Sequence, residues 1–397
     1  MAKNIIFCAD GTWNGPDKRT GKSAIDSDDS AGEIDDTAVT NVIKLFAYLA
    51  GQGTPDTFAL KNEQEKRHVD TGGSLLQTAK YLHGVGDSSS LVKKALGGVF
   101  GIGVISRIIR GYTFISRSYQ PGDAITICGF SRGAYTARAL AGMIAKVGLL
   151  DPRTYDSTDK EEAYRLAAAA WAKSKSLSLQ GHGLLTVLAG RIIDFIENVI
   201  ALPLSANSLI PDVPLKAVAV WDTVGSLGIP KYVADRRYDL FRFVDQDLSA
   251  KVERGFHAMA IDELRADFPV TRWNPRAGVE ETWFVGAHAD VGGGYPDAES
   301  RLSDEALGWM IGKLKHIGVA FVDPLQPPPQ PRTLGQAIHT PWKDFPFDQL
   351  AQSPRAVNRT DTVHASVVAR WIGDAGYRPE SMGTITGAPP WKVDDTV

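Results

Sequence analysis

The chain has 397 residues, 43% of them hydrophobic and 22% charged, and a formal net charge of −3 at pH 7. This composition is typical of a globular protein with a sizeable core. The near-neutral charge and the lack of a Lys/Arg block exclude a general nucleic-acid binder. The two cysteines, Cys8 and Cys128, lie in apolar runs, which predicts buried thiols and no disulfide framework.

The N-terminal run 4–9 predicts a buried strand. It is too short for the hydrophobic part of a signal peptide, and the sequence contains no uninterrupted apolar span of 18 residues. We therefore expect a protein that is cytoplasmic as synthesised, has no signal peptide and does not span a membrane.

Short apolar runs alternate with helical patterns along the chain. The predicted strands are 4–9, 77–84, 124–130, 215–222 and 282–287, and the helical patterns are 41–50, 134–147, 161–173 and 304–315. This alternation indicates an α/β fold of the α/β-hydrolase type, with a mostly parallel central sheet and helices on both faces. Ligands of such sheets bind beyond the carboxyl ends of the strands.

One domain is predicted over residues 1–397, with a helical insertion at 150–210 and a C-terminal extension, 323–397, packed on the core. Within the insertion, the stretch 184–204 is broadly apolar with one charged helix face. It is either a lid that opens against a lipid surface or a core helix with a solvated stripe. The glycine-rich segment 95–103 predicts a flap.

The strongest motif is Gly129-Phe130-Ser131-Arg132-Gly133, which follows an apolar strand and precedes an alanine-rich helix. Strand, turn and helix are the context that a G-x-S-x-G nucleophile elbow requires. The serine sits on a sharp turn, so the residues two before and two after it must lack side chains. Ser131 is therefore the predicted nucleophile.

A serine nucleophile needs a base and an acid later in the chain, in the order Ser, Asp or Glu, His. Asp222 ends the strand of AVAVWD, and His288 follows the strand of ETWFVGAH and enters a glycine-rich turn. His257 lies in a helix-like pattern, and His83 precedes a glycine-rich segment as a weaker pocket residue. The remaining histidines are predicted at the surface: His68, His182, His316, His339 and His364.

The opening turn Asp10-Gly11-Thr12 ends the first strand. An oxyanion needs two donors, of which one is the main-chain N–H after the nucleophile, here that of Arg132. The second donor is predicted in the opening turn, at Gly11 or Thr12. The predicted substrate pocket contains Asp10, Trp13, Phe130 and Asp290, and Asp290 is also expected to brace the turn that carries His288.

Two other functions remain open from these residues. A strand that ends in Asp-Gly-Thr also occurs in phosphatases with an aspartate two positions earlier, where this chain has Cys8. A metal- or aspartate-dependent phosphatase would use the Asp10 turn, with Asp222, His288 and Asp290 as further ligands, although their spacing matches no dense metal motif. A non-catalytic binding module on the same fold is the other alternative.

Eight segments together resemble the uncharacterised α/β-hydrolase family that includes the type VI secretion phospholipase effectors with a GxSxG elbow. They are CADGTWN, TNVIKLF, GVGD, GFSRGAYTARALAGMI, VWDTVGSLG, HAMAIDELR, WFVGAHADVGGGY and LSDEALGWM, between residue 5 and about 315. GVGD departs from the more usual GVGT.

This resemblance implies a serine ester hydrolase, a lipase, phospholipase or esterase, with Ser131, Asp222 and His288 at the triad positions. From the spacing of the possible ligands we predict no metal and no cofactor. It also implies hydrolysis of glycerophospholipids with transient contact at a membrane surface. Export by type VI secretion on a spike protein and neutralisation by an immunity protein are further implications.

Overall fold

The structure, a computed structural model, describes residues 2–11, 39–53, 63–83, 101–179, 202–224, 246–325, 328–331, 333–344, 347–349, 351–383 and 391–396. Several predictions fall outside these ranges: the roles of Thr12, Trp13 and His182, most of the flap at 95–103, and all but the last three residues of the lid or core helix 184–204.

Within the described chain one sheet has ten strands in the order β12-β11-β10-β9-β8-β5-β1-β4-β3-β2. From β12 to β4 all neighbours are parallel, whereas β3 and β2 are antiparallel additions. The prediction of a mostly parallel α/β sheet is therefore confirmed. The strands are β1 Asn4–Ala9, β2 Gln52–Gly53, β3 Glu63–Val69, β4 Leu75–Leu82, β5 Ala124–Phe130, β8 Leu215–Trp221, β9 Val252–Ala260, β10 Val279–Phe284, β11 Thr362–His364 and β12 Lys392–Asp394, and β6 Leu149–Leu150 and β7 Leu209–Ile210 form a separate ladder.

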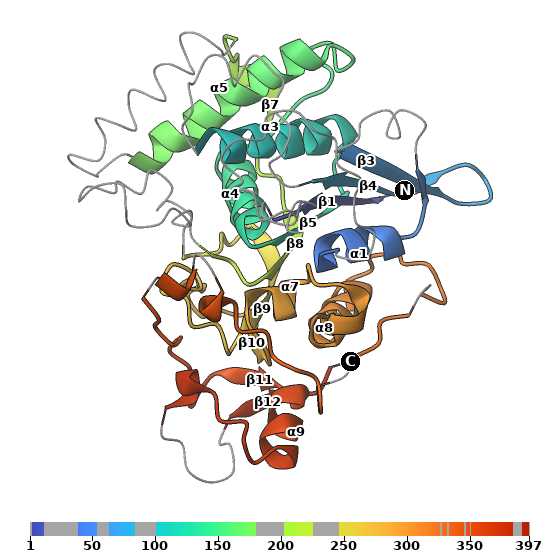
Figure 1. Ribbon diagram of the computed structural model, residues 1–397. Helices are drawn as coiled ribbons and strands as arrows, with labels where there is room; N and C mark the ends of the chain where they lie inside the picture. Colours follow the sequence, from blue (N-terminus) through green and yellow to red (C-terminus); the bar gives the residue numbers. More distant parts are fainter. Residues whose placement is uncertain are drawn as a thin grey trace.

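Helices cover both faces of this sheet (Figure 1). Their bounds are α1 Asn41–Tyr48, α3 Gly101–Ser118, α4 Arg132–Val147, α5 Lys160–Leu179, α7 His288–Gly292, α8 Arg301–His316 and α9 Ala365–Gly373. Successive side chains of β1 point to opposite faces. Ile5 and Phe7 pack in a core with α3, α4 and α5, and Ile6 and Cys8 pack in a second core with α1 and α8.

Helix α3 was not predicted, because glycines at its start and at Gly111 favour a flexible segment. A Cβ at Gly111 would lie 2.6 Å from Leu140 Cδ2 and 2.7 Å from Phe7 Cε1. The glycine therefore lets α3 approach β1 and α4 closely, so it serves packing instead of ending the helix.

The helical interpretation of His257 is wrong, since this residue lies in β9. Residues Phe256 to Ala260 are all buried, and a parallel strand that is buried on both faces is a continuous apolar run without alternation. The surface prediction for His364 is also wrong, because it ends β11 and is only 6% exposed.

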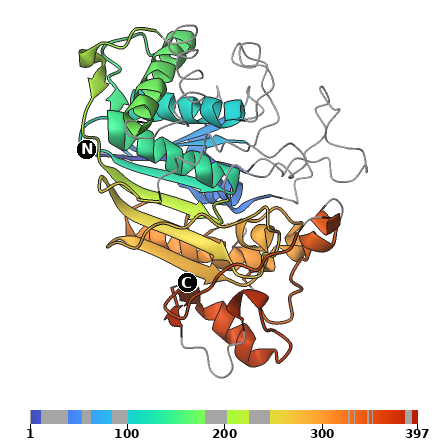
Figure 2. The ribbon, with the colours of Figure 1, turned by 90° about the vertical axis from the view of Figure 1, so that its left-hand side faces the viewer.

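The C-terminal extension adds β11 and β12 to the sheet beyond β10, and Figure 2 shows it in red at that edge. Its apolar side chains, among them Val363, Val367 and Trp371, form a third core with Trp283 of β10 and Met259 of β9. The extension therefore shares one sheet and one core with the residues before it.

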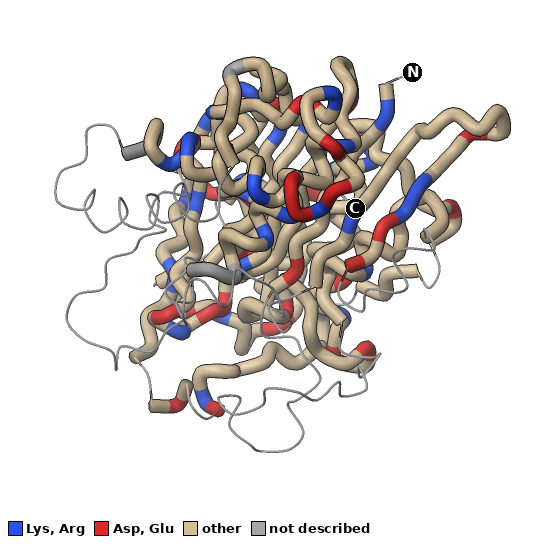
Figure 3. The backbone as a smooth tube through the Cα atoms, turned by 90° about the horizontal axis from the view of Figure 1, so that it is seen from above, with Lys and Arg blue, Asp and Glu red and all other residues tan. Residues whose placement is uncertain are grey.

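Basic and acidic residues are interspersed over the described part of the chain (Figure 3). None of the described helices is both long and apolar enough to cross a bilayer.

Candidate active site

The predicted functional residues follow parallel strands of one sheet, in which β5 and β8 are neighbours and β10 lies beyond β9. Ser131 follows β5, Asp222 follows β8 and His288 begins α7 shortly after β10. In the sheet, β4 lies on one side of β1 and β5 on the other, although β4 and β5 follow β1 in the chain. Ligands of parallel sheets bind beyond the carboxyl ends of the strands where the strand order switches in this way, and Ser131 follows the carboxyl end of β5.

The elbow has the strained geometry that its sequence predicts. Ser131 has φ 57° and ψ −121°, a left-handed conformation that is rare outside glycine. A Cβ at Gly129 would lie 2.4 Å from the Gly133 carbonyl oxygen, and one at Gly133 would lie 2.1 Å from the Ala9 carbonyl oxygen. Gly129 is therefore needed for the tight turn itself, and Gly133 is needed for the turn to pack against the end of β1.

The three predicted triad side chains form one chain of hydrogen bonds. Ser131 Oγ lies 2.8 Å from His288 Nε2, and His288 Nδ1 lies 2.5 Å from Asp222 Oδ2. All three residues are buried, with exposed fractions of 8%, 6% and 0% for Ser131, His288 and Asp222. A hydroxyl, an imidazole and a carboxylate in this order have the geometry of a serine hydrolase triad.

Burial lowers the pKa of His288 below its usual value, although the hydrogen bond and charge of Asp222 oppose this change. Burial alone would raise the pKa of Asp222, but the charge of Arg355 and the bond to His288 hold it well below its usual range. At neutral pH the imidazole is therefore neutral and able to accept a proton, while the carboxylate is ionised.

Sequence reasoning missed several groups around the imidazole. Arg355 donates from both terminal nitrogens to the Asp222 carboxylate. Glu263 accepts the main-chain N–H of His288 at 3.1 Å and is paired with Arg265. Glu263 and Arg265 lie in the motif HAMAIDELR, whose resemblance to the family was a signal for them, whereas no pattern singled out Arg355.

Two aromatic rings enclose His288. The centroid of the Phe130 ring lies 4.6 Å from that of the imidazole ring. The centroid of the Phe268 ring lies 5.2 Å from it, in an edge-to-face arrangement. A Cβ at Gly292 would lie 1.9 Å from Phe130 Cε2, so α7 approaches Phe130 closely only because this position is glycine. Phe130 therefore holds the imidazole from beside the nucleophile.

Asp10 serves the opening turn as a buried acceptor. Its carboxylate accepts hydrogen bonds from Thr40 Oγ1 at 2.8 Å and from Tyr81 Oη at 2.6 Å. It also accepts the N–H of Gly11 at 2.6 Å. These bonds make Asp10 a brace for the turn beside Ser131, and they do not favour its use as a phosphatase nucleophile.

The predicted oxyanion donors differ in their position and in their hydrogen bonds. Arg132 begins α4 directly after Ser131, so its main-chain N–H lies in the first turn of the helix, where the dipole favours negative charge. Gly11 packs against Ser131, with a hypothetical Cβ 3.4 Å from Ser131 Cβ. Its N–H, however, is bonded to Asp10, and Thr12 lies outside the described residues.

Asp290 braces α7, as the sequence predicts, but it does not line an open pocket. Its side chain is 0% exposed. One oxygen accepts the N–H of Ala287 at 2.9 Å, and the other lies 2.6 Å from Nδ1 of His339. His339 also reaches Glu299 at 3.2 Å. The His339 side chain remains 23% exposed and links the extension to α7.

The predicted metal alternative would need Asp10, Asp222, His288 and Asp290 to converge. Among the described residues, no three His, Cys, Asp or Glu side chains are placed to hold a metal ion. Each of the four instead has the hydrogen-bond partners given above.

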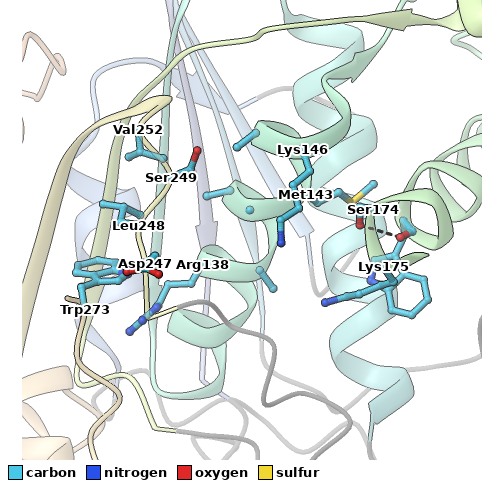
Figure 4. A pocket seen from close by; sticks show the side chains of 15 residues that line it. Arg138, Met143, Lys146, Ser174, Lys175, Asp247, Leu248, Ser249, Val252 and Trp273 are labelled. Carbon is cyan, nitrogen blue, oxygen red and sulfur yellow. Dashed lines mark hydrogen bonds between the residues drawn. The ribbon is translucent and has the colours of Figure 1, made fainter. Parts of the chain in front are cut away.

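A separate cavity of about 370 Å³ lies along α4 and α5 (Figure 4). Its lining includes Arg138, Lys146, Trp171, Leu248 and Trp273. None of the triad side chains is among the described lining residues, so this cavity does not contain the triad.

Comparison with known proteins gives one family and a few distant relatives. The family model described as "T6SS, Phospholipase effector Tle1-like, catalytic domain" matches residues 3–313. An uncharacterized protein of Saccharomyces cerevisiae is 29% identical over a 163-residue alignment that covers 37% of this chain and 18% of that protein.

Two solved structures are also similar. An uncharacterized protein from Pseudomonas aeruginosa is 17% identical, with a TM-score of 0.42, over 83% of this chain and 49% of that one. The structure of the Tle1 effector bound to the VgrG spike from the type 6 secretion system is 18% identical, with a TM-score of 0.35, over 76% of this chain and 53% of that one. This chain thus spans about half the length of the solved structures it matches.

The family match covers most of the chain, including Ser131, Asp222 and His288, and it confirms the resemblance drawn from the motifs. The chain belongs to the Tle1-like family of type VI secretion phospholipase effectors, within the catalytic domain that defines that family of hydrolases.

Proposed function

We propose that this chain is a serine hydrolase that cleaves carboxylic esters of glycerophospholipids through a covalent acyl-enzyme. The observation that carries the proposal is the hydrogen-bond chain from Ser131 Oγ through both ring nitrogens of His288 to Asp222, with distances of 2.8 and 2.5 Å. The phospholipase family of the chain supports the substrate class.

The proposed first half-reaction acylates the serine. Ser131 Oγ attacks the ester carbonyl carbon while its proton passes to His288 Nε2, and the carbonyl electron pair moves onto oxygen. The main-chain N–H of Arg132 and the α4 N-terminus stabilise that oxyanion, with a second donor predicted in the Gly11–Thr12 turn. Collapse of the intermediate expels the lysophospholipid alkoxide, which takes the proton from His288.

The second half-reaction releases the fatty acid. Water attacks the acyl-Ser131 carbonyl and gives a proton to His288 Nε2, and the serine leaves with that proton restored. Asp222 remains ionised throughout, and its hydrogen bond keeps the His288 tautomer whose Nε2 accepts protons. Because burial lowers the pKa of His288, the base is in its active form at neutral pH.

We further propose that the chain acts as an exported effector. The family supports export by type VI secretion after synthesis in the cytoplasm, with transient contact at the membrane that holds the substrate. The solved Tle1 effector was captured with the VgrG spike, and a spike protein and an immunity protein are the proposed partners here. Co-purification with each candidate partner tests this assignment.

The decisive experiment compares wild type and Ser131→Ala with a fluorophosphonate probe and a substrate panel. We expect labelling of wild type only, and a loss of at least about 10³-fold in kcat/KM for the variant at unchanged melting temperature. The panel runs from short aryl esters to phospholipid vesicles. Equal labelling of both proteins, or chelator-sensitive phosphatase activity without labelling, would contradict the proposal.

A further inference from the structure

Arg355 lies in the C-terminal extension, beyond residue 313, where the family match ends. Its guanidinium group nevertheless faces the acid of the proposed triad. Nη1 donates to Asp222 Oδ1 at 2.5 Å and Nη2 donates to Asp222 Oδ2 at 2.9 Å. Both residues are buried, with exposed fractions of 6% for Arg355 and 0% for Asp222. This bidentate ion pair fixes the plane of the Asp222 carboxylate.

The same two nitrogens also donate to two main-chain carbonyl groups. Nη1 also donates to the Ala260 carbonyl oxygen at 2.8 Å, and Nη2 to the Phe268 carbonyl oxygen at 2.9 Å. The Phe268 ring packs edge to face on His288. Arg355 thus connects Asp222 and Phe268, which contact His288 from different directions.

We propose that Arg355 is a positioning residue of the active site, which orients the Asp222 carboxylate toward His288 and balances its buried charge. The inference rests on the proposed function and adds the C-terminal extension to the machinery of the reaction. Arg355 acts through Asp222, since its terminal nitrogens are already committed to the carboxylate and two carbonyl groups.

The charges that face His288 come in two pairs. The carboxylates are Asp222 and Glu263, and the cations are Arg355, bound to Asp222, and Arg265, which donates to Glu263 at 2.7 and 2.8 Å. Loss of Arg355 would leave one uncompensated negative charge beside the imidazole. A negative charge stabilises the imidazolium, so the pKa of His288 would rise and the acidic limb of the activity profile would move to higher pH.

The test uses Arg355→Gln and Arg355→Lys with Arg370→Gln as the matched control. Arg370 also belongs to the extension, is 8% exposed, and donates to the Thr333 carbonyl oxygen, away from the triad. For Arg355→Gln we expect at least a roughly 10-fold loss of kcat on a short ester at unchanged KM, and an acidic limb shifted up by about 1 pH unit.

The two comparison variants separate charge from geometry. Arg355→Lys keeps the charge but cannot bind both oxygens in one plane, so its kcat falls while its acidic limb stays in place. Arg370→Gln leaves both kcat and the limb unchanged even if its melting temperature falls. A folded Arg355→Gln protein with wild-type kcat and limb would overturn the inference.

A measurement without turnover keeps this inference separate from the proposed function. The His288 Nδ1 proton, in its 2.5 Å bond to Asp222, is followed by NMR over pH in wild type and Arg355→Gln. A rise of about 1 unit in the pKa of His288 supports the inference even in a protein without ester activity, and an unmoved titration overturns it. Should Arg355→Gln fail to fold, Arg355→Lys decides: reduced kcat supports the inference and wild-type kcat overturns it.

Discussion

Ser131 and Asp222 both have left-handed backbone conformations, with φ of 57° and 39°. Each such residue costs about 1–3 kcal/mol relative to an ordinary conformation. The surroundings hold both in place: Ser131 N–H donates to the Trp221 carbonyl oxygen at 3.1 Å, and Asp222 N–H donates to the Ala258 carbonyl oxygen at 2.7 Å. The sheet thus fixes the nucleophile and the acid through their main chains.

Substitution of the elbow glycine Gly133 tests how closely the turn packs against β1. In Gly133→Ala, the new Cβ would lie 2.1 Å from the Ala9 carbonyl oxygen and 2.5 Å from that of Asp10. Both are backbone atoms that cannot move aside, so we expect a loss of several kcal/mol in unfolding free energy and of ester activity. Gly142→Ala in the same helix meets nothing within 4 Å and should stabilise by about 0.5–1 kcal/mol. Urea denaturation distinguishes them, and equal effects would contradict the packing argument.

The buried carboxyl group of Asp262 should make the unfolding free energy depend on pH. Burial raises the pKa of this carboxyl to about 6, although the Gly286 N–H and Tyr377 O–H donate to it. Because the folded value lies above the unfolded value, the contribution to stability is complete below about pH 4 and is lost as the pH rises through about 6. The ionised group therefore costs on the order of 3 kcal/mol above neutrality.

Asp262→Asn removes this cost while an amide oxygen still accepts from both donors. We expect the variant to exceed wild type in unfolding free energy at pH 7.5 by on the order of 3 kcal/mol, and to match it near pH 4. Gly142→Ala changes no titratable group, so its difference from wild type should be the same at both pH values. A flat difference for Asp262→Asn would rule out the buried charge as its cause.

At the scale of elements, Thr40 ties the start of α1 to the end of β1. Its Oγ1 accepts the N–H of Ile43 as the helix N-cap and donates to the Asp10 carboxylate. Thr40→Val has the same shape without the hydroxyl. It should lose about 2 kcal/mol of unfolding free energy, because it removes the helix N-cap and leaves the Asp10 carboxylate without one of its donors. Thr40→Ser keeps both bonds, so a loss as large as that of the valine variant would indicate packing instead.

Helices and strands could be predicted where a local sequence pattern determines them. The strand ahead of Ser131 and the helix after it follow from an apolar run and small residues around a required turn. Helix α3 and strand β9 were missed because tertiary packing overrides local preference: Gly111 serves close contact with Phe7, and His257 lies in a strand buried on both faces.

For the whole molecule, the positions of Ser131, Asp222 and His288 after predicted parallel strands indicated that they lie at one edge of the sheet, since parallel strands share their carboxyl ends. The partner of Asp222 was not predictable in this way. Arg355 follows a segment with little periodicity, and its place depends on how the extension returns along the sheet. Ion pairs between distant segments leave no period in the sequence, so only coordinates reveal them.

The extension is expected to be indispensable to the folded enzyme. Beyond Arg355, it supplies Asp361, which accepts two bonds from Arg272 at 2.9 and 3.0 Å, and Ser381, which donates to the Ile261 carbonyl oxygen at 2.6 Å. A chain that ends at residue 322 would leave Asp222 and the third core uncovered and expose the edge of β10. We therefore expect it to aggregate or to show no cooperative thermal transition.

A shorter deletion makes the comparison quantitative. A chain that ends at residue 383 loses β12 and Trp391 but keeps Arg355, β11 and α9. It should have a lower melting temperature yet retain fluorophosphonate labelling and hydrolysis of short esters, because the contacts to Asp222 remain. Calorimetry and labelling of both truncated chains against wild type provide the test. If the chain ending at 322 melts cooperatively and labels as fast as wild type, the active site is complete without the extension, and Asp222 does not depend on Arg355.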